Sequence, residues 1–180
     1  MRQIKNHLIE IIREKALLKG KVILSSGKKS SYYIDLRRIS LSPPGLILIS
    51  KLFFDYIQKY KITSVGGPSI GADPIVAGIL YLASQRKYPL TGFLVRKQKK
   101  QHGTGAIIEG NIPTKKKKIL LIDDVATTGG ALIYSIDVLS AHGLRPLLCG
   151  CVVDRLSGAR ESIEKKGIKF FSLIEIEEIL

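Results

Sequence analysis

The chain has 180 residues, of which 45% are hydrophobic and 24% are charged. This composition supports a sizeable core and excludes a disordered chain, and no apolar run approaches the ~20 residues of a membrane-spanning helix. The formal net charge of +14 favours an anionic partner such as nucleic acid, a membrane surface or a phosphorylated substrate.

An amphipathic helix is the first predicted element, over about residues 3–18. Its apolar residues recur at helical spacing: Ile4, Leu8, Ile11 and Ile12. Because charged residues interrupt this pattern, the segment lacks the continuous apolar stretch of a signal peptide. An irregular segment with a short strand near 32–35 follows.

Helices and strands alternate through the rest of the chain. We expect helices over 43–59, 73–85, 131–143 and 158–167, and strands over 62–67, 91–96, 106–110, 118–123, 146–154 and 168–174. The strands at 118–122 and 147–153 are apolar on both faces, which is typical of a parallel sheet covered by helices on both sides. The sequence therefore predicts an α/β fold, in which ligands bind beyond the carboxyl ends of the strands.

Two cysteines, Cys149 and Cys151, lie in one predicted strand. Residues two apart in a strand point to the same face and cannot form a strain-free disulfide. Buried, reduced thiols are typical of a cytosolic protein, so we expect a cytoplasmic location. No second Cys or His pair stands nearby, which argues against a metal site here.

The stretch "ILLIDDVATTGGA", residues 119–131, places Asp123 and Asp124 between a strand and a helix start. Its glycines allow backbone N–H groups to converge on an anion, and the helix points its positive end at the same place. The lysine of a P-loop is absent. Two carboxylates beside a phosphate fit a ligand that also carries sugar hydroxyls or Mg²⁺, which indicates a phosphorylated ribose. The alternative is an acid pair that only caps the following helix.

This stretch resembles the signature of the type I phosphoribosyltransferases. The resemblance implies that Asp123 and Asp124 hold the ribose hydroxyls of phosphoribosyl diphosphate (PRPP). It also implies that the following loop holds the 5′-phosphate, through Val125, Ala126, Thr127, Thr128, Gly129, Gly130 and Ala131. The implied fold is a single domain over residues 1–180. In it a mostly parallel central sheet is flanked by helices, and a small N-terminal hood is formed mainly by about residues 1–40.

A second motif, "RKQKKQHGTG", spans residues 96–105 and concentrates positive charge in a loop between two strands. On composition alone it is a basic surface hairpin. The ordered sequence resembles the mobile loop of the orotate phosphoribosyltransferase family. That resemblance implies that Arg96, Lys97, Lys100 and His102 contact the diphosphate of PRPP. It makes Lys100 and His102 catalytic together with the acid pair, and it implies a homodimer whose loop reaches the neighbouring site.

The third motif is "VGGPSIGADPI", residues 65–75, where glycines allow a close backbone approach to an anion. A plain tight turn is the local alternative. In the family this segment lines the diphosphate pocket. Some members carry lysine where Gly71 and Ser25 stand in this chain, so those two contacts are absent here.

The remaining family matches concern the base. Tyr32 and Tyr33 in "SSGKKSSYYIDLRRI" resemble the two aromatics of the hood that lie over orotate, although locally they read as core residues. Arg155, at a predicted strand end, matches the partner of the orotate carboxylate, where a planar fork of donors fits a planar anion. A salt-bridged surface pair is the local alternative. Thr127 is expected to contact the edge of the base.

Together these matches imply transfer of ribose 5-phosphate from PRPP to orotate, giving orotidine 5′-monophosphate and diphosphate in UMP biosynthesis. Mg²⁺ is expected as cofactor, bound mainly through PRPP oxygens and without protein metal ligands. No decarboxylase domain is evident, so the product should be orotidine monophosphate. The alternatives are a phosphoribosyltransferase for a purine and a nucleic-acid-binding protein. Because basic residues do not alternate with aromatics, and residues 115–118 ("KKKK") read as a solvated turn, we expect no nucleic-acid or membrane partner.

Overall fold

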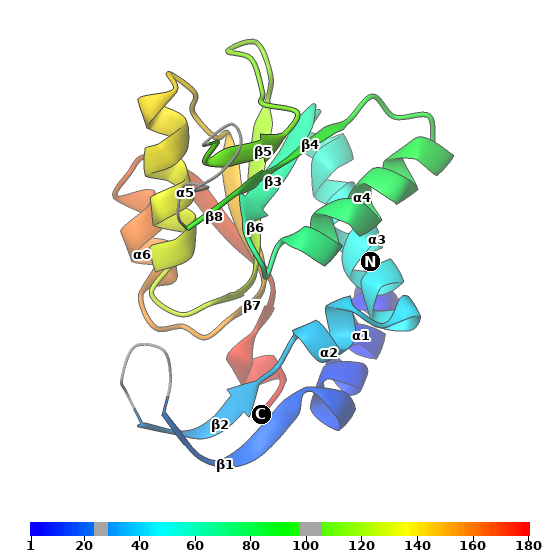
Figure 1. Cartoon of the computed structure of the whole chain (residues 1–180). Coiled ribbons are helices and arrows are strands. Elements are labelled where there is room, and N and C mark those ends of the chain that lie inside the picture. Colours follow the sequence, from blue (N-terminus) through cyan, green and yellow to red (C-terminus); the bar gives the residue numbers. More distant parts are fainter. Residues whose placement is uncertain (24–28, 98–105) are drawn as a thin grey trace.

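The computed structural model describes residues 1–23, 29–97 and 106–180, which form a six-stranded sheet between helices and a separate two-stranded sheet (Figure 1). The order in the large sheet is β5-β4-β3-β6-β7-β8. Five strands are parallel, namely β3 (Ser64–Pro68), β4 (Thr91–Val95), β6 (Ile119–Ala126), β7 (Leu148–Asp154) and β8 (Lys169–Glu175). β5 (Ile108–Gly110) pairs antiparallel with β4. The predicted mostly parallel sheet is confirmed.

Helices cover both faces of this sheet (Figure 1). One face packs against α3 (Pro43–Tyr60) and α4 (Asp73–Gln85), and the other against α5 (Gly130–Ala141) and α6 (Ala159–Glu164). Successive side chains of β6 alternate between the two cores: Leu120 and Ile122 join the first, Ile119 and Leu121 the second. Each such burial stabilises the fold by about 1.5–3 kcal/mol, which explains the continuous apolar run in the sequence.

Both cysteines lie in β7, and both are buried free thiols, as predicted. Burial raises the pKa of Cys149 to about 12. The thiol is therefore protonated and acts as a small apolar side chain of the core.

β6 is longer than the sequence pattern indicated. We expected the strand to end at Asp123, but pairing with β7 continues through Val125–Val153 and Ala126–Asp154. Asp123 and Asp124 therefore lie within the strand, and their backbone is held by a neighbour that is distant in the sequence.

The N-terminal segment also departs from expectation. α1 (Arg2–Lys15) is shorter than the predicted helix, because the residues after Ala16 enter β1 (Leu17–Ile23). β1 pairs antiparallel with β2 (Lys29–Ile34), and the short helix α2 (Arg37–Ser40) follows. The sequence pattern indicated neither β1 nor α2, because pairing and packing between distant segments determine both.

This N-terminal unit lies beside the carboxyl end of the large sheet (Figure 1). Side chains of α1 contact the C-terminal residues in and after the 3₁₀ turn η1 (Ile176–Glu178), which follows β8. The Arg13 guanidinium donates to the carbonyls of Ile179 at 2.8 Å and Glu178 at 2.7 Å, and Lys5 pairs with Glu178 at 2.8 Å. Among the described residues, no helix combines the length and apolarity needed to cross a bilayer.

Candidate functional site

The acid pair on β6 contains a buried carboxyl, that of Asp123, whose pKa is strongly shifted. Asp123 is only 8% exposed, and one of its carboxylate oxygens accepts a hydrogen bond from the Asp124 amide at 2.9 Å. Asp124 in turn accepts from the Val125 amide at 2.7 Å. Burial, and then the neighbouring charge of Asp124, raise the pKa of Asp123 well above its ordinary value. A ligand with hydroxyl donors or positive charge would relieve both effects.

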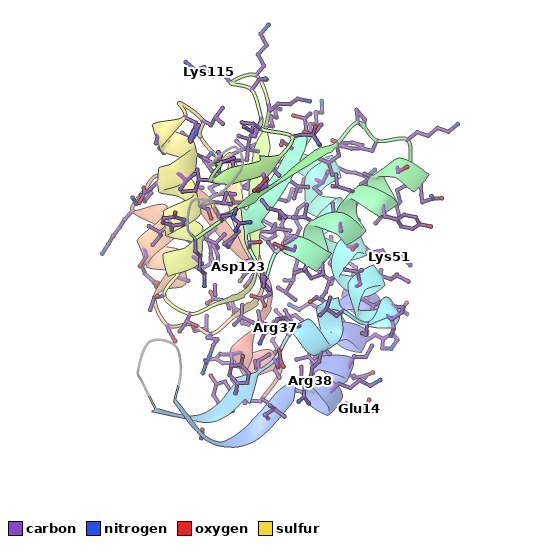
Figure 2. All side chains as sticks on the ribbon, in the orientation of Figure 1. Glu14, Arg37, Arg38, Lys51, Lys115 and Asp123 are labelled. Carbon is purple, nitrogen blue, oxygen red and sulfur yellow. The ribbon has the colours of Figure 1, made fainter. Side chains whose placement is uncertain are left out.

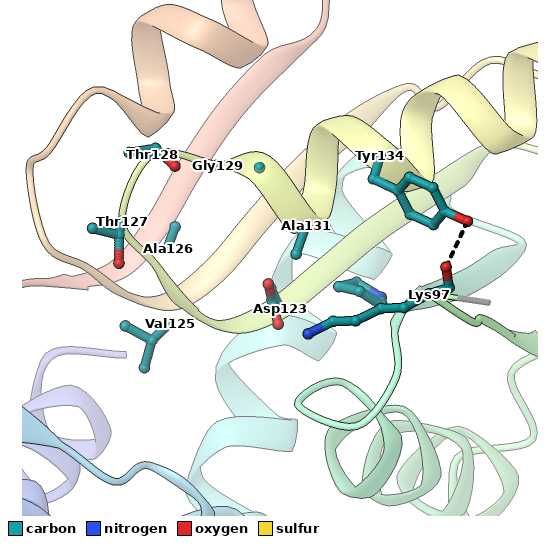
Figure 3. A pocket seen from close by; sticks show the side chains of 11 residues that line it. Lys97, Asp123, Val125, Ala126, Thr127, Thr128, Gly129, Ala131 and Tyr134 are labelled. Carbon is teal, nitrogen blue, oxygen red and sulfur yellow. Dashed lines mark hydrogen bonds between the residues drawn. The ribbon is translucent and has the colours of Figure 1, made fainter. Parts of the chain in front are cut away.

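A loop after the acid pair surrounds a cavity of about 460 Å³ (Figure 3). Gly129 adopts a left-handed conformation (φ 78°), which favours glycine and lets the chain turn into α5. The first turn of α5 therefore directs its backbone N–H groups and its positive end at the cavity. The cavity is lined by Pro68, Lys97, Asp123, Val125, Ala126, Thr127, Thr128, Gly129, Gly130, Ala131 and Tyr134. The structure thus brings the predicted loop residues together around one anion-sized space.

A second cavity of about 680 Å³ lies between the sheet and the hood. It shares six lining residues with the first: Pro68, Lys97, Asp123, Val125, Thr127 and Ala131. Its other walls come from the hood at residues 33–37, from residues 69–71 after β3, and from Asp124 and Arg155. Figure 2 shows Arg37 and Asp123 on opposite sides of this region. The two cavities therefore form one elongated site with the acid pair between them.

Two glycines, Gly67 within β3 and Gly71 after it, allow the backbone to lie close to β6. A Cβ at Gly67 would lie 1.9 Å from the Ile122 carbonyl oxygen. A Cβ at Gly71 would lie 2.6 Å from the nearer Asp124 carboxylate oxygen and 2.9 Å from that of Asp123. The close approach in this structure is made to β6 and its acid pair, and the approach to an anion stays a prediction.

The basic residues after β4 separate into two groups. Lys97 lines both cavities, and its ammonium group points toward Asp123 (Figure 3). Arg96 lines neither cavity and lies beside Glu109 of β5, with 3.9 Å between the charged atoms. Lys100 and His102 lie outside the described residues.

Tyr134, a residue that the motifs did not indicate, holds the start of this basic segment. Its hydroxyl donates to the Lys97 carbonyl at 3.2 Å (Figure 3). Tyr134 lies four residues after Gly130 and therefore on the same helix face as the phosphate loop. That spacing was the only signal in the sequence that could have revealed it.

The predicted base-binding residues come together on the hood side of the site. Arg155 follows β7, and its guanidinium lies 4.7 Å from the ring centre of Tyr32, which is cation–π geometry. The Arg155 amide donates to the Ala126 carbonyl at 2.9 Å, which fixes its position relative to the acid pair. Tyr33 lines the second cavity directly.

Asp35 and Arg37 are two further lining residues that the motifs missed. They form an ion pair at 3.2 Å, and this pair raises the pKa of Arg37. Their signal in the sequence was weak, because "DLRR" is an ordinary polar turn when no neighbouring element is known. Across the described residues, no cluster of three or more His, Cys, Asp or Glu side chains could hold a metal ion.

Comparisons with known proteins agree with this geometry. The family model for the phosphoribosyl transferase domain matches residues 37–178. An orotate phosphoribosyltransferase of Pyrococcus horikoshii is 39% identical over 180 residues, covering 98% of this chain and 94% of the relative.

Two solved structures of Mycobacterium tuberculosis orotate phosphoribosyltransferase are similar over 98% of both chains. The complex with Fe(III) dicitrate has a TM-score of 0.83 at 31% identity. The complex with PRPP has a TM-score of 0.79 at 28% identity. The predicted type I phosphoribosyltransferase fold is thereby confirmed. The chain belongs to the orotate phosphoribosyltransferase family of the phosphoribosyl transferases.

Proposed function

We propose that this chain transfers ribose 5-phosphate from PRPP to orotate, which gives orotidine 5′-monophosphate and diphosphate for pyrimidine biosynthesis. The observation that carries the proposal is the elongated site with the acid pair at its centre. One end is a phosphate-sized loop, and the other end holds an arginine and tyrosines suited to a planar anion.

PRPP fits the side formed by β6 and α5. Its 5′-phosphate would lie in the loop of residues 125–131, where backbone N–H groups, threonine hydroxyls and the helix end favour negative charge. Its ribose hydroxyls would then reach the carboxylates of Asp123 and Asp124. These carboxylates are strong acceptors, and the ribose donors would relieve their mutual repulsion.

Orotate fits the hood side. Its carboxylate would meet the guanidinium of Arg155, which lies over the ring of Tyr32, while the Arg155 backbone amide donates to the Ala126 carbonyl. Tyr33 lines the same cavity and would lie against the base, and Thr127 would contact the base edge. The ring nitrogen would then face the anomeric carbon of PRPP across the acid pair.

The chemical step exchanges one bond for another. The orotate ring nitrogen gives up its proton to solvent and forms a bond to the anomeric carbon, as the bond from that carbon to the diphosphate oxygen breaks and the diphosphate leaves with its electron pair. Positive charge builds on the ribose, where Asp123 and Asp124 stabilise it, and negative charge builds on the diphosphate. Lys97 is placed to stabilise that negative charge, and we propose that Arg96, Lys100 and His102 join it when their segment closes over PRPP.

Mg²⁺ fits this site as an ion held mainly by the substrate. Asp123 and Asp124 line the hood-side cavity and would add negative charge near the ion, while the oxygens of PRPP would be its main ligands. When bound with PRPP, Mg²⁺ would neutralise part of the diphosphate charge. No dedicated protein metal centre is needed for the step.

The wider context is also proposed. We expect one catalytic domain over residues 1–180 with the hood at about 1–40, and a homodimer whose segment 96–105 reaches the neighbouring subunit's site. The buried free thiols suit a cytosolic protein.

A panel of bases tests the proposal. Purified protein with PRPP and Mg²⁺ is incubated separately with orotate, uracil, adenine and hypoxanthine, and the nucleotides formed are separated by chromatography. The proposal predicts orotidine monophosphate with orotate and at least about 100-fold less product from each other base, because only orotate offers a carboxylate to Arg155. A purine nucleotide as the main product would contradict the assignment of the hood side.

A further inference from the structure

Most of the surplus positive charge lies at the edge of the sheet opposite the candidate site. Five connecting segments meet there, at residues 58–63, 84–90, 111–118, 142–147 and 164–169. The structure describes all five, and together they carry twelve lysines and arginines and a single acid, Glu164. We call these five segments the basic rim. Its formal charge is +11, against +14 for the whole chain.

The segments of the basic rim lie side by side, because the parallel strands bring the connections before them to one edge. Hydrogen bonds at the start of the strands hold each segment beside the next. In strand order they run from Thr91 N to Thr63 O (3.2 Å), from Ser64 N to Lys118 O (3.1 Å), from Leu147 N to Ile119 O (2.9 Å) and from the Arg145 guanidinium to Gly167 O (3.0 Å). Neighbouring strands are about 4.8 Å apart, so the rim spans about 19 Å. Charges scattered along the sequence thus form one continuous row.

Little on the protein neutralises this row. Eleven of the twelve side chains are exposed, and Lys117 is half-buried. In the part of the chain that the structure describes, Lys166 is the only one of the twelve in an ion pair, with Asp137 at 2.5 Å. An exposed row of like charges with so few acidic neighbours creates a positive potential that attracts polyanions.

We infer that the basic rim binds the phosphate backbone of duplex nucleic acid without reading its sequence. This departs from the sequence-based expectation of no nucleic-acid partner, because strand order, which the sequence pattern did not reveal, brings the charges of the rim together. A duplex rises about 3.4 Å per base pair, so a 19 Å row faces about five or six phosphates of one strand. Lysines predominate in the rim, and their flexible ammonium groups bind phosphates as point charges.

Single strands and membranes fit the rim less well. Its two tyrosines, Tyr60 and Tyr88, are half-buried, and the Tyr88 hydroxyl donates to the Ile62 carbonyl. The one exposed aromatic ring in the five described segments is that of His142, and a single imidazole does not form the series of stacking rings that a single strand needs. Within the five segments of the rim, the exposed large apolar residues are Ile112 and Leu147. Two such residues are fewer than an amphipathic membrane anchor needs.

The rim and the candidate site lie at opposite ends of β6. Figure 2 shows Lys115 at one end of the molecule and Asp123 on the side facing the hood. Lys118 in the rim and Asp123 in the site are five residues apart along the strand direction, which separates them by about 17 Å. Nucleic-acid binding and phosphoribosyl transfer can therefore take place together, and rim substitutions should leave transfer activity unchanged.

Matched triple variants test the inference. The rim variant is Lys115→Gln, Lys116→Gln and Lys118→Gln. The control variant is Arg2→Gln, Lys15→Gln and Lys51→Gln, which removes the same charge from exposed residues of α1 and α3. Binding of a fluorescent 20-base-pair DNA duplex of arbitrary sequence is measured by anisotropy between 50 and 200 mM salt, and the transfer activity of each variant reports its folding.

We expect the rim variant to bind at least about tenfold more weakly than the control at 0.1 M salt. The plot of log affinity against log salt has a negative slope. In the rim variant this slope should become less steep by about 0.9 for each phosphate contact removed, whereas in the control variant it should not change. Equal weakening in both variants would overturn the inference, since it would reflect net charge alone. So would binding to vesicles containing phosphatidylserine without any binding to the duplex.

Discussion

Replacement of Gly71 by alanine is the sharpest local test of how the acid pair is positioned. Gly71 has no left-handed φ, so its backbone accepts alanine without strain. The new Cβ, however, would lie 2.6 Å from an Asp124 carboxylate oxygen and 2.7 Å from its Cγ. Non-bonded carbon contacts are favourable near 3.5–4.0 Å, so the carboxylate must move by about 1 Å.

The cost of that movement can be derived from the structure. The Asp124 carboxylate accepts from the Val125 amide at 2.7 Å, and a hydrogen bond to a charged group contributes about 1.5–3 kcal/mol. A misplacement of about 1 Å in a reacting constellation costs up to about 100-fold in rate, equivalent to about 2.7 kcal/mol. We therefore expect Gly71→Ala to lower kcat/KM for PRPP between about tenfold and 100-fold. Weakening of the hydrogen bond from the Val125 amide should also lower the unfolding midpoint by several degrees.

A double-mutant cycle supplies the control. Initial rates at varied PRPP are measured for the parent, Gly71→Ala, Asp124→Ala and the double variant. Once the Asp124 carboxylate is absent, alanine at 71 still meets the Asp123 carboxylate oxygen at 2.9 Å but no longer displaces Asp124, so the two losses should be less than additive. A Gly71→Ala enzyme within twofold of the parent, or fully additive losses, would refute this reasoning.

Three further predictions concern the proposed roles. The pKa of the buried Asp123 carboxyl is higher in the native state than in the unfolded state. At any pH between these two pKa values the native state therefore holds more protons, so the free energy of unfolding falls as the pH rises through this window. Asp123→Asn should therefore gain thermal stability relative to the parent as pH rises from 4 to 8, while transfer activity collapses; a pH-independent difference in melting temperature would contradict this. Arg155→Ala should raise the KM for orotate far more than that for PRPP, and equal effects would argue against its carboxylate role. Lys100→Ala should lower kcat by orders of magnitude with an unchanged melting curve, and unchanged turnover would remove that segment from the mechanism.

Features that a short stretch determines were accessible from the sequence. The apolar run before Asp123, with glycines and a helix start after it, required a buried parallel strand and a turn around an anion. The structure has the buried parallel strand and the turn into α5, and the loop residues surround the first cavity. Anion binding in that turn stays a prediction. Cys149 and Cys151 were likewise expected in the core, because their strand is apolar on both faces.

Features that depend on distant partners were not accessible. β1 exists because Leu17 and Leu18 pair with Ile34 and Tyr33. Without knowledge of these partners, residues 16–18 look like a continuation of the preceding helix. The hood side of the site, including Arg37, depends on how the N-terminal unit lies against the carboxyl end of the sheet. The basic rim is hidden in the sequence for the same reason, since strand order rather than spacing brings its segments together.

The most direct test of the central claim is the ultraviolet absorbance of orotate after PRPP and Mg²⁺ are added to the purified protein. The proposed function predicts a loss of the orotate band that requires both additions and forms one diphosphate for each orotate consumed. An unchanged band, beside a known orotate phosphoribosyltransferase that is active under the same conditions, would contradict the proposed transfer to orotate.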